Sequence, residues 1–166
     1  MSLIYLSLGS NIDRQRHICA ALDALSESFG DLEISTVYES EAVGFQGDSF
    51  YNLVVGVYSD LPVGEIATIL KQIEDNNGRD RSSPKFAPRT LDIDILTVDS
   101  LVGEVDGINL PRSEVLKNAF VLQPLAELAS EMLHPITGKS IAEHWQLFDK
   151  TTQKLWSIDF HWQPSS

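Results

Sequence analysis

The order in which two hydrophobic periodicities follow one another constrains the fold of this chain most. Apolar residues alternate with a period of two in some segments, as in strands, and recur every three or four residues in others, as in amphipathic helices. Over the first 98 residues the pattern predicts strand, helix, strand, strand, helix, strand. This order matches the ferredoxin-like β-α-β-β-α-β arrangement, so we predict an α+β sandwich.

The expected strands cover residues 3–8, 33–39, 49–58 and 91–98. The expected helices have apolar stripes within residues 18–29 and 61–76, and Asp60 and Gly78 are the expected cap and stop of the second helix. In the strand 91–98, Leu91, Ile93 and Ile95 share one face, and Asp92, Asp94, Leu96 and Val98 share the other. Farther along, the sequence predicts C-terminal additions: a helix that opens at Pro124 and another over 140–148.

Residues 154–162 form a further alternating segment. Trp156, Ile158, Phe160 and Trp162 would share one face of a strand, which is too apolar to be left in water. We therefore expect an extra C-terminal strand at a sheet edge, either in the same chain or in a partner. Because no linker composition interrupts the chain, we expect one domain over 1–166, a monomer, with a dimer through this strand as the alternative.

The overall charge excludes some classes of partner. The chain has 24 acidic and 12 basic residues, a formal net charge of −12, so it should repel nucleic acid and anionic membranes. A single cysteine, Cys19, rules out an intrachain disulfide, and no apolar stretch approaches 18 residues. The expected location is the cytoplasm.

The basic residues are unevenly placed. Residues 1–70 hold only two of them, after which five fall within nineteen positions: Lys71, Arg79, Arg81, Lys85 and Arg89. Such a cluster in an acidic protein indicates a local site for a small anion, although a solvated loop is the simpler interpretation of charge alone.

Asp92 and Asp94 follow this cluster directly. Two residues apart on a strand, their Cβ atoms would lie about 6.5–7 Å apart on one face, where they can converge on a hard cation such as Mg²⁺. Taken alone, such a pair also fits a solvated strand end. Next to flexible cations, it suits a nucleoside triphosphate with Mg²⁺, although neither standard glycine-rich phosphate loop occurs in the sequence.

Three motifs give the chain a recognisable resemblance. They are Ser-Leu-Gly-Ser-Asn at 7–11, Val-Gly at 43–44 with Asp-Ser-Phe-Tyr-Asn at 48–52, and Pro-Arg-Thr-Leu-Asp-Ile-Asp-Ile-Leu at 88–96. With Phe-Val-Leu-Gln-Pro-Leu at 120–125 and His-Pro at 134–135, they make residues 3–148 resemble the 6-hydroxymethyl-7,8-dihydropterin pyrophosphokinases of folate biosynthesis.

The resemblance implies transfer of pyrophosphate from ATP to the hydroxymethyl oxygen of the pterin, with release of AMP. It implies that Asp92 and Asp94 hold two Mg²⁺ ions and act in catalysis with Arg79 and Arg89. The residues it places at the nucleotide are Glu74, Arg79, Arg81, Lys85, Arg89, Ile95 and Arg112. Those it places at the pterin are Ser40, Val43, Gly44, Phe50, Asn52 and Phe120, with the ring between the two phenylalanines. From the residues alone, Phe50 and Asn52 share one strand face and are either a recognition pair or a core ring beside a turn-proximal amide. Their flat ring and amide suit the amino-pyrimidinone edge of the pterin that the resemblance implies.

Two departures concern the ATP site. The family usually has His where this chain has Arg112, and Arg where it has Asn118. Arg112 and Lys117 still offer positive charge there. The departures leave two alternatives: a diverged paralogue that uses another nucleotide or heterocyclic alcohol, and a binding module without catalysis.

Overall fold

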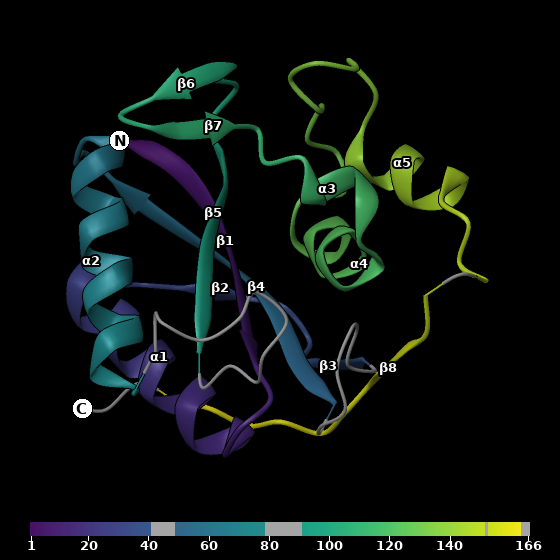
Figure 1. Cartoon of the computed structure of the whole chain (residues 1–166). Coiled ribbons are helices and arrows are strands. Elements are labelled where there is room, and N and C mark those ends of the chain that lie inside the picture. Colours follow the sequence, from purple (N-terminus) through teal and green to yellow (C-terminus); the bar gives the residue numbers. More distant parts are fainter. Residues whose placement is uncertain (41–48, 79–90, 152, 164–166) are drawn as a thin grey trace.

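A computed structural model describes residues 1–40, 49–78, 91–151 and 153–163 (Figure 1). Its main sheet has the strand order β5-β1-β4-β3-β8, with β2 also paired to β4. The strands are β1 (Ser2–Ser10), β2 (Glu33–Ile34), β3 (Tyr38–Ser40), β4 (Phe50–Ser59), β5 (Asp92–Val98) and β8 (Leu155–Ser157); β6 (Gly103–Val105) and β7 (Ile108–Leu110) form a separate hairpin. The helices are α1 (Arg14–Phe29), α2 (Val63–Asn76), α3 (Glu114–Lys117), α4 (Ala119–Leu128) and α5 (Ile141–Leu147).

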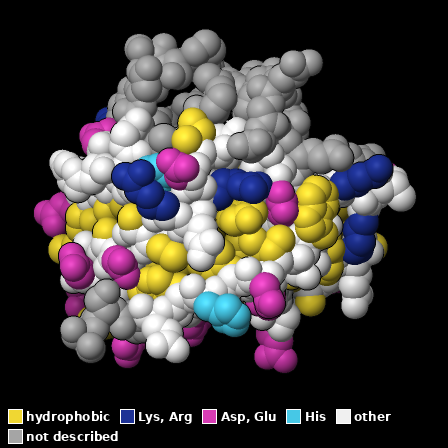
Figure 2. Space-filling model, turned by 90° about the horizontal axis from the view of Figure 1, so that it is seen from below, with side chains coloured by type: hydrophobic (Ala, Val, Ile, Leu, Met, Phe, Trp, Pro, Cys, Tyr) yellow, Lys and Arg dark blue, Asp and Glu magenta, His cyan; other side chains and the backbone are white. Residues whose placement is uncertain are grey.

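The five strand pairings of the main sheet are all antiparallel; they place β1 between β5 and β4, with β3 beyond β4. This is the ferredoxin-like strand order, so the predicted α+β fold is confirmed. None of the described helices is long and apolar enough to cross a membrane. Figure 2 shows the molecule from below, where basic side chains stand at separate places among the acidic ones.

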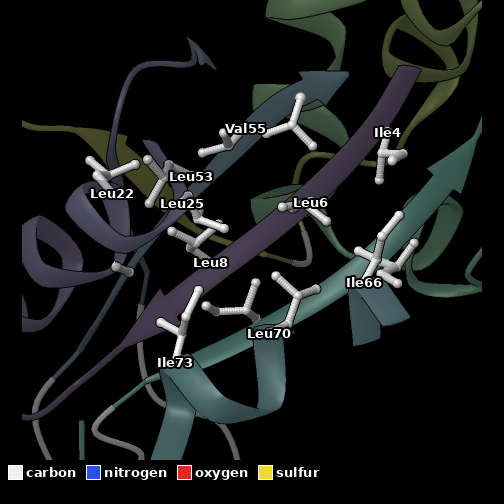
Figure 3. Close-up of a cluster of buried hydrophobic side chains, with 14 of the residues drawn as sticks. Ile4, Leu6, Leu8, Leu22, Leu25, Leu53, Val55, Ile66, Leu70 and Ile73 are labelled. Atoms are coloured by element: carbon white, nitrogen blue, oxygen red, sulfur yellow. The ribbon is translucent and has the colours of Figure 1, made fainter. Parts of the chain in front are cut away.

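One face of the sheet is covered by α1 and α2. The alternating residues Ile4, Leu6 and Leu8 of β1 meet Leu22 and Leu25 of α1 and Ile66, Leu70 and Ile73 of α2, and all of these are at most 5% exposed (Figure 3). The apolar face of the strand, with its period of two, and the apolar stripes of the helices, with their period of 3.6, therefore pack into one hydrophobic core. This packing places β1 at the centre of the molecule.

The opposite face is covered in part by α4. Tyr5, Val54 and Leu96 of the sheet form a second core cluster with Val121, Leu122 and Leu125 of this helix. Glu127 of α4 accepts hydrogen bonds from Thr36 N–H at 2.7 Å and from the Tyr38 hydroxyl at 3.1 Å. Burial, together with this carboxylate, raises the pKa of Tyr38 to about 12, so its hydroxyl stays protonated as the donor.

The strand expected at 33–39 is two strands, β2 and β3. Ile34 pairs with Val55 and Tyr38 pairs with Asn52. The segment from β2 to β3 therefore advances four positions while β4 advances three. The extra residue is a bulge, which a period-two reading does not reveal. Ser35 holds the irregular segment, because its hydroxyl accepts the Val54 N–H at 2.9 Å.

A second bulge corrects the predicted face of Val98. Tyr5 pairs with Thr97 and the next residue, Leu6, pairs with Ile95, so Leu96 is the extra residue of β5. Leu96 keeps its expected face, but the alternation inverts after it and Val98 joins the cluster of Ile93 and Ile95.

Two helix starts also differ from the prediction. The helix expected to open at Pro124 begins at Ala119 and contains Pro124, since burial of its apolar surface offsets the hydrogen bond that proline cannot donate. Asp60 does not cap α2; it pairs with the Met1 ammonium at 3.2 Å. The cap comes from the β6–β7 turn, where Asp106 Oδ2 accepts the Gly64 N–H at 2.9 Å.

The tail forms a shorter strand than the alternation predicts. Only Leu155–Ser157 pairs, with β3 of the same chain, and Trp156 is 44% exposed. Ile158, Phe160 and Trp162 are partly buried against the first core cluster as the tail runs along the sheet toward α1 (Figure 1).

Candidate active site

The strand register assembles a row of site residues from three neighbouring strands. Gly9 of β1 pairs with Asp92 of β5 on one side and with Asn52 of β4 on the other. We call Asp92, Gly9 and Asn52 the polar row. At about 4.8 Å per strand, the backbones of Asp92 and Asn52 lie about 10 Å apart on one face of the sheet.

Gly9 keeps the middle of the polar row open. A Cβ at this position would lie 3.4 Å from Asn52 Oδ1 and 3.8 Å from Phe50 Cδ1. A larger side chain would therefore fill the space beside the amide and the ring. The strand predicted over 3–8 stops short of Gly9, which entered the sequence analysis only within the motif at 7–11, whereas β1 continues to Ser10. A glycine inside a strand is a signal for a close approach.

Four of the residues expected at the pterin come together on this face. Asn52 is 5% exposed, and its Nδ2 donates to Ser40 Oγ at 2.8 Å. Ser40 pairs with Phe50 in the β3–β4 register, and Phe120 of α4 packs with the second core cluster on the same side of the sheet. Val43 and Gly44 lie outside the described residues.

Asp92 and Asp94 share the same face and are half-buried. Among the described residues there is no group of three or more carboxylate, histidine or cysteine ligands. Two carboxylates nevertheless fit Mg²⁺, which is commonly held by one or two of them and completes its shell with water and phosphate oxygens.

Arg112 lies beside this pair. Its backbone N–H donates to Leu96 O at 2.8 Å, which anchors the residue two positions beyond Asp94 along β5. Its Nη2 lies 3.6 Å from Asp94 Oδ1, and its Nε lies 3.1 Å from Glu114 Oε2. The structure thus joins an expected nucleotide residue to an expected metal ligand that is eighteen positions away in sequence.

Glu74 and Ile95 lie at the outer edge of β5. Glu74 is 8% exposed, and its Oε2 accepts the Ile93 N–H at 2.8 Å. The Ile95 side chain is in the first core cluster, so a nucleotide contact from this residue would use its backbone, which faces the same edge as that of Ile93. Arg79, Arg81, Lys85 and Arg89 lie outside the described residues.

The ferredoxin-like sheet and its polar row define an α+β protein whose candidate site combines a carboxylate pair with an aromatic ring and a buried amide on one face of the sheet. The family model described as 7,8-dihydro-6-hydroxymethylpterin-pyrophosphokinase matches residues 5–130. The 2-amino-4-hydroxy-6-hydroxymethyldihydropteridine pyrophosphokinase of Aquifex aeolicus is 36% identical over 145 residues, which cover 86% of this chain and 90% of that protein. The enzyme of the same name from Porphyromonas gingivalis is 37% identical, with 81% and 95% covered.

Among solved structures, HPPK-DHPS of Plasmodium falciparum with pterin and p-hydroxybenzoate has a TM-score of 0.68 at 15% identity. The match covers 87% of this chain and 42% of that one, so this chain spans about two fifths of its length. The likeness supports the fold.

The chain belongs to the 7,8-dihydro-6-hydroxymethylpterin pyrophosphokinase family. This membership confirms the reaction that the sequence resemblance implied, pyrophosphate transfer from ATP to 6-hydroxymethyl-7,8-dihydropterin in folate biosynthesis.

Proposed function

We propose that this chain transfers pyrophosphate in a Mg²⁺-dependent reaction on the open face of the sheet, with the pterin at the Asn52 end of the polar row and the triphosphate at the Asp92 end. The observation that carries the proposal is the strand register. It puts the Asp92 carboxylate, a suitable Mg²⁺ ligand, on the same face as the buried Asn52 amide, with their backbones about 10 Å apart and only Gly9, which has no side chain, between them. A bicyclic ring with a hydroxymethyl arm suits that span.

At the pterin end, Asn52 would read the edge of the ring. One of its amide hydrogens is engaged by Ser40, which fixes the plane of the amide before any substrate arrives. A preorganised donor and acceptor loses little entropy on binding. Phe50 and Phe120, from β4 and α4, would supply the apolar faces for the ring.

At the phosphate end, Asp92 and Asp94 would hold two Mg²⁺ ions. Mg²⁺ held there would supply positive charge that offsets the negative charge developing on the phosphates during transfer. Arg79, Arg89 and Arg112 would neutralise the remaining charge, with Glu74, Arg81, Lys85 and the Ile95 backbone nearer the nucleoside. Catalysis would come from positioning and electrostatics, so the residues need supply no strong base.

The deciding experiment measures AMP release by the purified chain with ATP, Mg²⁺ and 6-hydroxymethyl-7,8-dihydropterin. We expect release to need both pterin and Mg²⁺, and Asp94→Asn to lower the rate at least a hundredfold, about 3 kcal/mol of transition-state stabilisation. Asp31→Asn, at an exposed carboxylate in the turn after α1, is the matched control. A wild-type rate for Asp94→Asn, or release without Mg²⁺, would reject the proposed metal role.

Arg112 and Asn118 make nucleotide choice a separate question. Parallel rates with ATP and GTP at fixed pterin concentration answer it: we expect ATP to be preferred, and a preference for GTP would favour the diverged paralogue.

A further inference from the structure

We propose that Gln153 is a positioning residue for the pterin, within a C-terminal strap, residues 153–157, that holds the two sides of the proposed pterin site in fixed relative positions. The inference rests on the proposed placement of the pterin between Phe120 and the Asn52–Ser40 pair. The strap lies outside the span 5–130 matched by the family model, and the reaction chemistry proposed above does not use it.

The first attachment is at the start of α4. Gln153 Oε1 accepts the Ala119 N–H at 2.7 Å, and Gln153 Nε2 donates to Lys117 O at 2.7 Å. Helix starts leave backbone N–H groups without partners, and the cap residue Asn118 makes no side-chain cap hydrogen bond here. Gln153 therefore performs the capping from a distant part of the chain, one residue before Phe120.

The second attachment is at β3. Leu155 pairs with Ser40 and Trp156 with Glu39, and Trp156 Nε1 donates to Glu39 Oε1 at 3.1 Å. Ser40 in turn accepts the amide hydrogen of Asn52. Without β8, β3 would be a three-residue edge strand, which is the least restrained position in a sheet.

The two attachments are only two residues apart. Gln153 holds the helix end that carries Phe120, and Leu155 holds the strand residue that orients Asn52. A stretch this short has little slack, so it fixes the aromatic wall relative to the polar wall. Loss of Gln153 should loosen pterin binding and leave the triphosphate end, on β5, unchanged.

The test compares Gln153→Ala, Gln153→Glu and the control Gln163→Ala, which removes an exposed glutamine of the same tail. Pterin affinity is titrated by fluorescence; the KM for ATP, kcat at saturating pterin, the Tm and hydrogen exchange in residues 119–122 are measured alongside. We expect Gln153→Ala to weaken pterin binding about three- to tenfold and to speed exchange at the start of α4, with the KM for ATP and kcat retained. Gln153→Glu, which keeps an acceptor for Ala119 N–H, should fall between wild type and Gln153→Ala.

Pterin affinity equal in Gln153→Ala and Gln163→Ala would overturn the inference. So would equal losses for pterin and ATP that follow a fall in Tm, because general destabilisation would then explain them. If the wild-type chain bound no pterin, the proposed function would fail, and the role of the strap with it. If the wild-type chain bound pterin and Gln153→Ala bound it equally well, only the role of the strap would be rejected.

Discussion

Nη2 of Arg112 lies 3.6 Å from Oδ1 of Asp94, although the two residues come from different segments of the chain. The contact follows from a backbone hydrogen bond, Arg112 N–H to Leu96 O, that lays the residue after Pro111 along β5. The Arg112 side chain is 37% exposed and also pairs with Glu114. Its charge therefore stands within reach of any phosphate that approaches Asp94.

Arg112→Gln should raise the KM for ATP about fivefold to tenfold at saturating Mg²⁺, because a partly exposed charge contact contributes about 1 kcal/mol. Pterin affinity should stay the same, since Asn52 lies two strands away. The measurement is steady-state kinetics with each substrate varied in turn. Arg16→Gln, at a 79% exposed arginine of α1, is the control, and an equal KM for ATP in both variants would contradict the prediction.

Asp106→Ala should destabilise the protein by about 1 kcal/mol, because it removes the acceptor for Gly64 N–H at the start of α2. In a chain of this length this corresponds to a fall in Tm of about 2–4 °C. Asp60→Ala, at the position that sequence alone favours as the cap, should change Tm less, since Asp60 is 74% exposed in a surface ion pair. Thermal unfolding of both variants checks the order, and a larger loss for Asp60→Ala would refute it.

The Glu39 carboxylate should make the stability of the folded protein depend on pH. The Ser49 hydroxyl, with Arg14 and the Trp156 indole, donates to its carboxylate and holds the pKa of Glu39 below its usual value. A carboxylate with a lower pKa in the folded state stabilises the fold above its unfolded pKa of about 4.3, and this contribution disappears as pH falls through the folded pKa.

We therefore expect Glu39→Gln to have a lower Tm than wild type at pH 7, with a difference that narrows as the pH falls below about 4. Tm values for both proteins across this range test the prediction. Glu27→Gln, at an exposed position of α1, provides the baseline. A difference for Glu39→Gln that is constant with pH would show that the charge of Glu39 is not the cause.

Gly9→Ala should weaken pterin binding and spare stability. The new Cβ would make ordinary contacts of 3.4 and 3.8 Å with Asn52 and Phe50, so the fold can accept it while the open middle of the polar row fills. Gly56→Ala is the informative contrast, because its Cβ would lie 3.0 Å from the Tyr5 ring and 3.2 Å from Glu33, away from the row. We expect Gly56→Ala to lower Tm without loss of pterin affinity per folded molecule. Pterin titration and thermal unfolding of both variants test this. Unchanged pterin affinity in Gly9→Ala would show that the polar row is not the pterin site.

Local periodicity was enough to predict the framework. Alternation in β1, β4 and β5 and the stripes of α1 and α2 give the strand and helix order, because each segment can bury its apolar side in only one way. The same rule put Phe50 and Asn52 on one face and Asp92 and Asp94 on one face. Bulges at β2–β3 and at Leu96 were missed, since an inserted residue depends on the partner strand and leaves no periodic signal.

The sequence by itself therefore determined which side chains share a strand face wherever no bulge intervenes and, through its motifs, which chemistry they suit. Only the tertiary structure decided which faces meet: the register that aligns Asp92, Gly9 and Asn52, the placement of Arg112 against Asp94, and the capping of α2 by Asp106 and of α4 by Gln153. The physical reason is that propensity and periodicity act between residues near in sequence. Strand register and caps from distant residues give partners to backbone N–H and C=O groups, and these groups have no partner within their own segment before the sheet assembles.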